Sequence, residues 1–208
     1  FALVSWGSEM CIRDSACDHC KLGYIPEPWK QRVAAACAGW QRSHYGWDVD
    51  PSIIRVVPDV LEAYELFLRE LLGAGNSVIV PTPAYMPFLS VPKLYDVDVI
   101  EIEMLQSGDT QTGEAQWLFD FDAIERAFAA GCHAFVLCNP HNPIGKVLTL
   151  EEELRLSDLA AQYDVRIFND EIHAPFVFEG KHIPFPTISE QAALQSMTAT
   201  SASKSFNI

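Results

Sequence analysis

The feature that most constrains the fold of this chain is the alternation of short apolar segments with longer amphipathic ones. The predicted strands span residues 77–80, 97–102, 134–138, 165–168 and 196–200, and the predicted helices span residues 27–44, 59–72, 122–130 and 149–163. Short strands that are almost continuously apolar are typical of a parallel sheet that is covered on both sides. We therefore predict an α/β fold, with a mainly parallel sheet covered by helices on both faces.

Local signals at the ends of these segments support the predicted boundaries. Three predicted helices start at a capping residue followed three positions later by an acid, which is typical of a helix N-terminus. These pairs are Asp59 with Glu62, Asp122 with Glu125, and Thr149 with Glu152. Gly46 is expected to end the first helix, and Pro81 to end the first strand.

The N-terminal residues differ from the rest of the chain. The sequence starts with Phe1, and residues 4–15 show neither helical nor strand periodicity. Residues 4–15 resemble translated sequencing-adapter sequence, so we predict that residues 1–15 are a non-native N-terminal tail. The alternative is an ordinary frayed terminus. Residues 16–45 are predicted as an N-terminal helical segment, and residues 46–208 as one α/β domain.

Composition excludes several classes of partner. The net charge of -14 over 208 residues disfavours nucleic acid and anionic membrane surfaces. No apolar run approaches the roughly 20 residues that span a bilayer, and no basic segment of a secretory signal is visible. The six cysteines are scattered, which favours a reduced, cytoplasmic setting. Cys17 and Cys20 have metal-ligand spacing but no second pair accompanies them, so no metal site is predicted.

Candidate functional residues follow four of the predicted strands. Tyr85 follows the strand at 77–80, Asn142 the strand ending at residue 138, Asp170 the strand ending at residue 168, and Lys204 the strand ending at residue 200. In open α/β sheets, ligands bind beyond the carboxyl ends of the strands. These four residues are therefore expected to converge on one small molecule.

The residue types suit a covalently held aldehyde cofactor. The amine of Lys204 can form a Schiff base and later take a proton from a substrate α-carbon. Asp170 can hold a protonated ring nitrogen, Asn142 can donate to a ring oxygen, and Tyr85 can stack on the ring. Taken singly, each also has an ordinary interpretation: a surface lysine, a helix or turn cap, a turn signal and a packed aromatic residue.

A phosphate group would need separate donors. Val60 and Leu61 lie in the first turn of a predicted helix, where backbone amides are free to bind an anion. The hydroxyl groups of Ser201 and Ser203 can add to them. The competing interpretation is a helix that Asp59 merely caps.

Three segments, at residues 83–88, 139–145 and 169–173, taken together with Lys204 resemble the pyridoxal-phosphate (PLP) enzymes of the class I/II aminotransferase superfamily. Within that superfamily, the sequence is most similar to the MalY/PatB-type C-S β-lyases, also called cystathionine β-lyases. The segments that support this closer likeness are residues 23–24, 44–51, 139–145, 170–173 and 203–207. The resemblance implies that residues 46–208 are part of a PLP-binding large domain, truncated just after Lys204.

The same resemblance implies roles for individual residues. Lys204 would carry PLP, Asp170 would hold its ring nitrogen, Asn142 its phenolate oxygen, and Tyr85 would stack on the ring. His173 would stand where many aminotransferases have a tyrosine. The resemblance also implies a homodimer with shared active sites, in which Tyr24 would contact the PLP phosphate of the neighbouring subunit. Asp59 departs from the family pattern, because many relatives have glycine there, and a carboxylate beside a phosphate is unfavourable unless it caps its own helix.

The implied reaction is β-elimination on cysteine S-conjugates such as cystathionine, which yields a thiol, pyruvate and ammonia. One alternative is an aminotransferase, because the same cofactor residues serve both reactions. A second alternative is a PLP-binding regulatory protein without turnover. The family's carboxylate-binding arginine and its small domain lie beyond the lysine, so the chain alone is expected to bind PLP poorly and to be nearly inactive.

Overall fold

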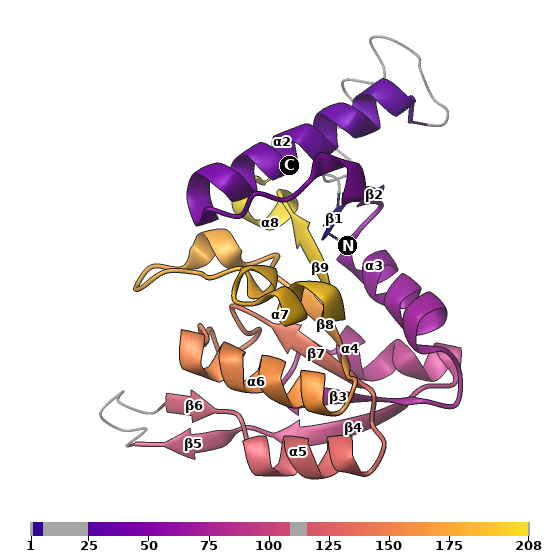
Figure 1. The fold of residues 1–208 in the computed structure, drawn as a ribbon, viewed down its shortest axis with the longest axis vertical. Helices are drawn as coiled ribbons and strands as arrows, with labels where there is room; N and C mark the ends of the chain where they lie inside the picture. Colours follow the sequence, from indigo (N-terminus) through magenta and orange to yellow (C-terminus); the bar gives the residue numbers. More distant parts are fainter. Residues whose placement is uncertain (1, 6–24, 109–115, 208) are drawn as a thin grey trace.

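Seven parallel strands form the central sheet of the computed structural model, which describes residues 2–5, 25–108 and 116–207 (Figure 1). Their order across the sheet is β2-β1-β9-β8-β7-β3-β4. The strands are β1 (Ala2–Ser5), β2 (Arg55–Val57), β3 (Ser77–Thr82), β4 (Asp98–Glu103), β7 (Ala134–Cys138), β8 (Arg166–Asp170) and β9 (Ser196–Ser201). A separate antiparallel pair joins β5 (Leu105–Ser107) to β6 (Gln116–Leu118). The predicted parallel α/β architecture is confirmed.

Helices and short helical turns connect the strands. The α-helices are α2 (Glu27–Tyr45), α3 (Val60–Leu66), α4 (Pro87–Ser90), α5 (Phe121–Ala129), α6 (Leu150–Gln162), α7 (Glu190–Gln195) and α8 (Ser203–Phe206). The shorter turns are η1 (Pro51–Ile53), η2 (Phe67–Leu72), η3 (Pro92–Tyr95), η4 (Ala174–Phe176) and η5 (Phe185–Thr187). Gly46 ends α2 in the left-handed conformation at φ 73°, as predicted for a residue without a Cβ.

Both faces of the sheet are buried, because successive strand residues point to opposite sides. On one face, Val78 and Val80 of β3 join Phe168 of β8 in a core cluster with α3 and η2. On the other face, Ile79 and Ile167 pack in a second cluster that includes residues of α5, α6 and α7. Figure 1 shows α3 and α6 on either side of the strands. This division explains why the central strands β3 and β7 are apolar at nearly every position.

Several predicted boundaries are wrong by a few residues. Asp120, not Asp122, caps α5, since its Oδ1 atom accepts a hydrogen bond from the backbone of Ala123 at 2.9 Å. Pro81 does not end β3; the pairing of β3 with β7 covers only its early residues, so a missing N–H there breaks no bond of that ladder. Asp170 is the last residue of β8 instead of the loop residue predicted.

The predicted helix at 59–72 is divided in two. Asp59 caps α3 as expected, because its Oδ1 atom accepts a hydrogen bond from the backbone N–H of Glu62 at 2.8 Å. After Leu66 the helix widens into the π-helical turn η2, whose Phe67 and Leu68 are fully buried in the core. Packing of these side chains, and not local propensity, sets the geometry of this segment.

The N-terminal residues contain one strand that the sequence did not predict. β1 (Ala2–Ser5) pairs in parallel with β2 on one side and β9 on the other. The expectation of no strand there is wrong for these residues, while residues 6–15 lie outside the described part of the chain. The non-native origin of the segment stays a prediction. Among the described residues, no helix combines the length and apolarity required to cross a membrane.

Candidate active site

Asp170 is a buried carboxylate at the carboxyl end of β8. It is 5% exposed, and its Oδ1 atom accepts a hydrogen bond from the backbone of Ile172 at 3.0 Å. In the described structure, no lysine, arginine or histidine forms an ion pair with it. Burial, with a smaller contribution from the charge of Glu171, raises the pKa of Asp170 to about 7. Asp170 is therefore suited to receive a cationic partner.

Cys138 lies beside Asp170, and sequence reasoning missed it. The two residues are register partners at the ends of β7 and β8, and the thiol sulfur is 4.0 Å from Oδ2 of Asp170. The backbone of Asn142 also hydrogen-bonds this sulfur, while burial raises the pKa of Cys138 well above its usual value. Cys138 thus connects Asp170 to the loop of Asn142. Its position as the last residue of a predicted strand was the available signal.

The positive charge of Lys204 acts on the imidazole of His173. Lys204 is exposed in the short helix α8, immediately after β9, and His173 is half-buried in the turn after β8. Burial first, and then the positive charge of Lys204, lower the pKa of His173. A neutral imidazole next to an amine can accept or donate a hydrogen bond without adding a second positive charge to the site.

Tyr85 and Asn142 lie on the loops after β3 and β7, two strands that are neighbours in the sheet. Tyr85 is 41% exposed, and its ring packs edge-on against Phe88 with the centroids 5.6 Å apart. Asn142 is half-buried. The predicted residues lie at or after the carboxyl ends of neighbouring or nearby strands, and among the described residues no hydrogen bond or ion pair joins Tyr85 or Asn142 to Lys204 or Asp170.

The predicted phosphate donors lie in two places, at the start of α3 and between the end of β9 and the start of α8. Val60 and Leu61 are the first residues of α3, and the carboxylate of Asp59 turns back to cap that helix. The hydroxyls of Ser201 and Ser203 are 2.9 Å apart. Nothing in these contacts tests phosphate binding, so these four donors stay a prediction. Tyr24, Cys17 and Cys20 lie outside the described residues.

The face of β8 opposite Asp170 carries a buried polar cluster. Glu171, 1% exposed, accepts hydrogen bonds from Asn169 Nδ2 at 2.7 Å and from the backbone of Phe185 at 2.9 Å. Its second oxygen lies 3.2 Å from Nε2 of His182. On α6, burial and then the charge of Glu171 raise the pKa of Glu153 to about 8. This cluster ties β8 to the segment that contains His182 and Phe185.

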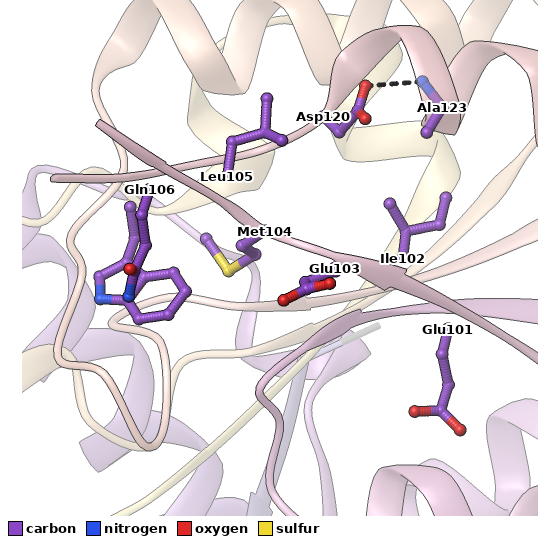
Figure 2. A pocket seen from close by; sticks show the side chains of 9 residues that line it. Glu101, Ile102, Glu103, Met104, Leu105, Gln106, Asp120 and Ala123 are labelled. Carbon is purple, nitrogen blue, oxygen red and sulfur yellow. Dashed lines mark hydrogen bonds between the residues drawn. The ribbon is translucent and has the colours of Figure 1, made fainter.

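A cavity of about 580 Å³ lies elsewhere, next to the edge strand β4 and the start of α5 (Figure 2). Its lining residues are Glu101, Ile102, Glu103, Met104, Leu105, Gln106, Trp117, Asp120 and Ala123. Figure 2 shows the carboxylate of Asp120 already engaged by the backbone of Ala123. No predicted site residue lines this cavity, so the candidate site is the strand-end cluster.

The comparisons identify the family. The profile of "Aminotransferase class I and II" matches residues 23–208. The chain belongs to this family. It is 38% identical over 186 residues to "Cystathionine beta-lyase" of Corynebacterium glutamicum, covering 89% of this chain and 47% of that protein. It is 31% identical over 218 residues to "Cystathionine beta-lyase PatB" of Bacillus subtilis (strain 168), covering 100% of this chain and 54% of that protein.

A solved structure supports the same placement. Cystalysin from Treponema denticola, described as containing a pyridoxal 5'-phosphate cofactor, matches with a TM-score of 0.83 and 28% identity, covering 98% of this chain and 50% of that one. The chain therefore spans about half the length of the relatives it matches. The predicted superfamily, its PLP dependence and its proximity to C-S lyases are confirmed, and an amino-acid substrate is consistent with the family.

The residues present fit PLP. Its protonated ring nitrogen is the kind of cation that a buried carboxylate such as Asp170 requires, because an uncompensated charge is costly there. The exposed amine of Lys204 is accessible for covalent attachment, and the donors of the Asn142 loop lie at the same sheet edge. The match thus depends on chemistry that the described side chains themselves provide.

Proposed function

We propose that the protein containing this chain catalyses PLP-dependent β-elimination on cysteine S-conjugates such as cystathionine. The observation that carries the proposal is the buried Asp170, which has no cationic partner in the described structure and ends a strand beside the loop of Asn142. The 38% identity to a protein named cystathionine beta-lyase favours this reaction over others of the family. PLP chemistry requires an amine that attaches the cofactor and a carboxylate that holds its ring nitrogen. In this proposal, Lys204 supplies the amine and Asp170 supplies the carboxylate.

When bound, PLP supplies an aldehyde for amines and a ring that accepts the electron pair left by a departing α-proton. Lys204 would hold the cofactor until substrate arrives, and its freed amine would then take the α-proton. Asp170 would hold the proton on the ring nitrogen. The elimination would consume one water and would release the thiol, pyruvate and ammonia.

Transamination is the second candidate, because the matching family profile is that of the aminotransferases. That reaction would move the amino group of the substrate to a 2-oxo acid and would release no thiol. Lys204 and Asp170 would have the same roles, so the site geometry supports both reactions equally. The sequence relatives named cystathionine beta-lyase favour elimination.

The deciding experiment uses the longest reading frame that encodes this chain, purified with PLP and given L-cystathionine. Pyruvate and free thiol formed without any 2-oxo acid would support the lyase. Product that appears only with an acceptor would assign an aminotransferase. PLP binding without either product would favour a regulatory protein.

Lys204→Ala is the matched variant for the covalent step. We expect this variant to abolish the absorption band of lysine-bound PLP, because alanine has no amine that can form the covalent bond to the cofactor. A band that survived unchanged would remove Lys204 from the mechanism. Lys181→Ala is the control, since Lys181 is an exposed lysine outside the proposed site.

A homodimer with shared active sites is part of the proposal. It rests on the family resemblance, by which Tyr24 would contact the phosphate in the neighbouring subunit. Light scattering on the purified protein would give its mass in solution. Mixing Tyr24→Phe with Lys204→Ala subunits should restore activity in part if the two residues act across an interface. A monomer that is fully active would contradict the shared site.

A further inference from the structure

We propose that His141 is a positioning residue that locks the Tyr85 loop to the Asn142 loop. The inference deepens the proposed function and rests on it for the cofactor roles of Tyr85 and Asn142. The Nε2 atom of His141 is 2.9 Å from the backbone carbonyl oxygen of Pro83, across the gap between two neighbouring loops. Pro83 precedes Tyr85 by two residues, and His141 directly precedes Asn142.

The two strands beneath these loops are joined along only part of their length. The pairing of β3 with β7 consists of Val78 with Ala134 and Ile79 with Phe135. Both strands continue beyond it, to Thr82 and Cys138. Pro81 has no N–H and cannot extend the ladder. The side chain of His141 therefore supplies a cross-link at the end of the sheet where the backbone supplies none.

Its own loop holds His141 firmly. The backbone N–H of His141 donates to the carbonyl of Lys146 at 2.7 Å, and its carbonyl accepts from the backbone N–H of Gly145 at 2.7 Å. Gly145 has φ 71°, the left-handed conformation that glycine adopts at low cost. Asn142 thus lies in a closed loop whose base is His141, so a constraint on His141 is passed to Asn142.

The chemistry of the imidazole fixes its protonation at one atom. A carbonyl oxygen only accepts, so Nε2 must carry the hydrogen. His141 is 3% exposed, and burial is the main cause that lowers its pKa, which favours the neutral ring. A neutral Nε2–H ring can hold the two loops together without placing a further positive charge near the cofactor.

Three variants of the full protein separate positioning from general stability. His141→Leu removes the donor, and His141→Gln retains an amide N–H that can reach a carbonyl. His133→Leu is the control, since His133 is exposed in the turn before β7. In PLP-free protein, we expect His141→Leu to increase hydrogen exchange in residues 83–88 and 139–146 together. His141→Gln should restore protection in both segments, and His133→Leu should change neither.

The second test measures PLP affinity and the circular dichroism of bound PLP in the holoprotein. We expect His141→Leu to weaken PLP binding by about three- to tenfold, the amount that one hydrogen bond is worth, and to reduce the circular dichroism that bound PLP acquires. His141→Gln should recover both signals. If the loops loosen but both PLP signals stay at the wild-type level, the positioning role is overturned. If the wild-type protein makes no pyruvate but the variants show the expected hydrogen-exchange pattern, the proposed function fails while the link between the two loops through His141 is supported.

One measurement is made on the wild-type protein, and a variant serves only to assign its signal. Nitrogen NMR of histidine-labelled PLP-free protein reports which ring nitrogen of His141 carries the hydrogen. We expect Nε2–H, assigned by its loss in His141→Gln. An Nδ1–H ring would overturn the proposal even if His141→Leu failed to fold, because Nε2 could then not donate to Pro83.

Discussion

Two consecutive carboxylates, Asp170 and Glu171, are buried at the end of β8 and differ in their partners. Glu171 accepts two hydrogen bonds and lies 3.2 Å from His182. Asp170 accepts one backbone hydrogen bond and has a thiol 4.0 Å away. Buried charges are tolerated when they are paired or hydrogen-bonded, and Oε1 of Glu171 accepts both of these bonds while the imidazole of His182 lies beside its Oε2. Asp170 has no cationic side chain within ion-pair distance in the described structure, so its charge is left for another group to compensate. The difference in neighbouring charge separates the candidate site residue from the structural one.

The largest effect is expected for Asp170→Ala in the holoenzyme. Turnover should fall roughly 10²- to 10³-fold, as when one preorganised electrostatic group is removed from an active site. The free energy of unfolding of the PLP-free protein should not fall, because no partner charge is left unpaired and because burial already disfavours the ionised form of Asp170. Steady-state kinetics and urea unfolding measure the two quantities. Near-normal turnover would remove Asp170 from its assigned role.

Glu171→Ala should show the opposite pattern. It leaves the Asn169 amide and the Phe185 backbone N–H without their acceptor and removes the carboxylate beside His182, so the free energy of unfolding should fall by about 3 kcal/mol. Urea unfolding of the PLP-free protein measures this loss. The control is Glu151→Ala, since Glu151 is exposed in the first turn of α6. A loss no larger than in the control would show that Glu171 is not the structural member of the pair.

The pH dependence of stability should come from the carboxyls with raised pKa values. Asp170 titrates near 7 in the folded protein against 3.8 ordinarily, and Glu153 near 8 against 4.5. The folded state therefore holds more protons than the unfolded state between these values, and stability falls as pH rises from about 4 to 8. Asp170→Asn and Glu153→Gln should each flatten this fall in PLP-free protein. A profile that rose over this range, or one unchanged by either variant, would contradict the assignment.

The sequence predicts five of the seven strands of the sheet and the positions of the candidate residues after the strands, because both depend on local patterns, but it misses β1 and β2. Strand β7 was predicted to the residue, since five consecutive buried positions leave little ambiguity. The contacts of Cys138 and His141 depend on which strands become neighbours, and that order is a tertiary property. Likewise, a carboxylate cannot be classed as satisfied or unsatisfied until its partners are placed. The sequence therefore singled out Asp170 through its motif but gave no reason to separate it physically from Glu171.

The smallest expected effect concerns the cap of α6, the helix that carries Glu153 on the Glu171 face. Thr149 and Glu152 form a reciprocal capping box, with Thr149 N donating to Glu152 Oε2 at 2.9 Å and Glu152 N donating to Thr149 Oγ1 at 3.2 Å. Thr149→Ala should cost about 1 kcal/mol of unfolding free energy, and Thr149→Ser should restore most of it.

PLP affinity should stay unchanged in Thr149→Ala, because the cap lies on the opposite side of the sheet from Asp170. Titration of PLP into the variant and the wild type tests this independence. The salt bridge from Lys146 to Glu152, 2.7 Å long, joins the cap to the loop that His141 closes. A loss of affinity of about threefold or more would therefore mean that the two faces are coupled through Lys146, and the separation of a structural from a functional carboxylate would no longer hold.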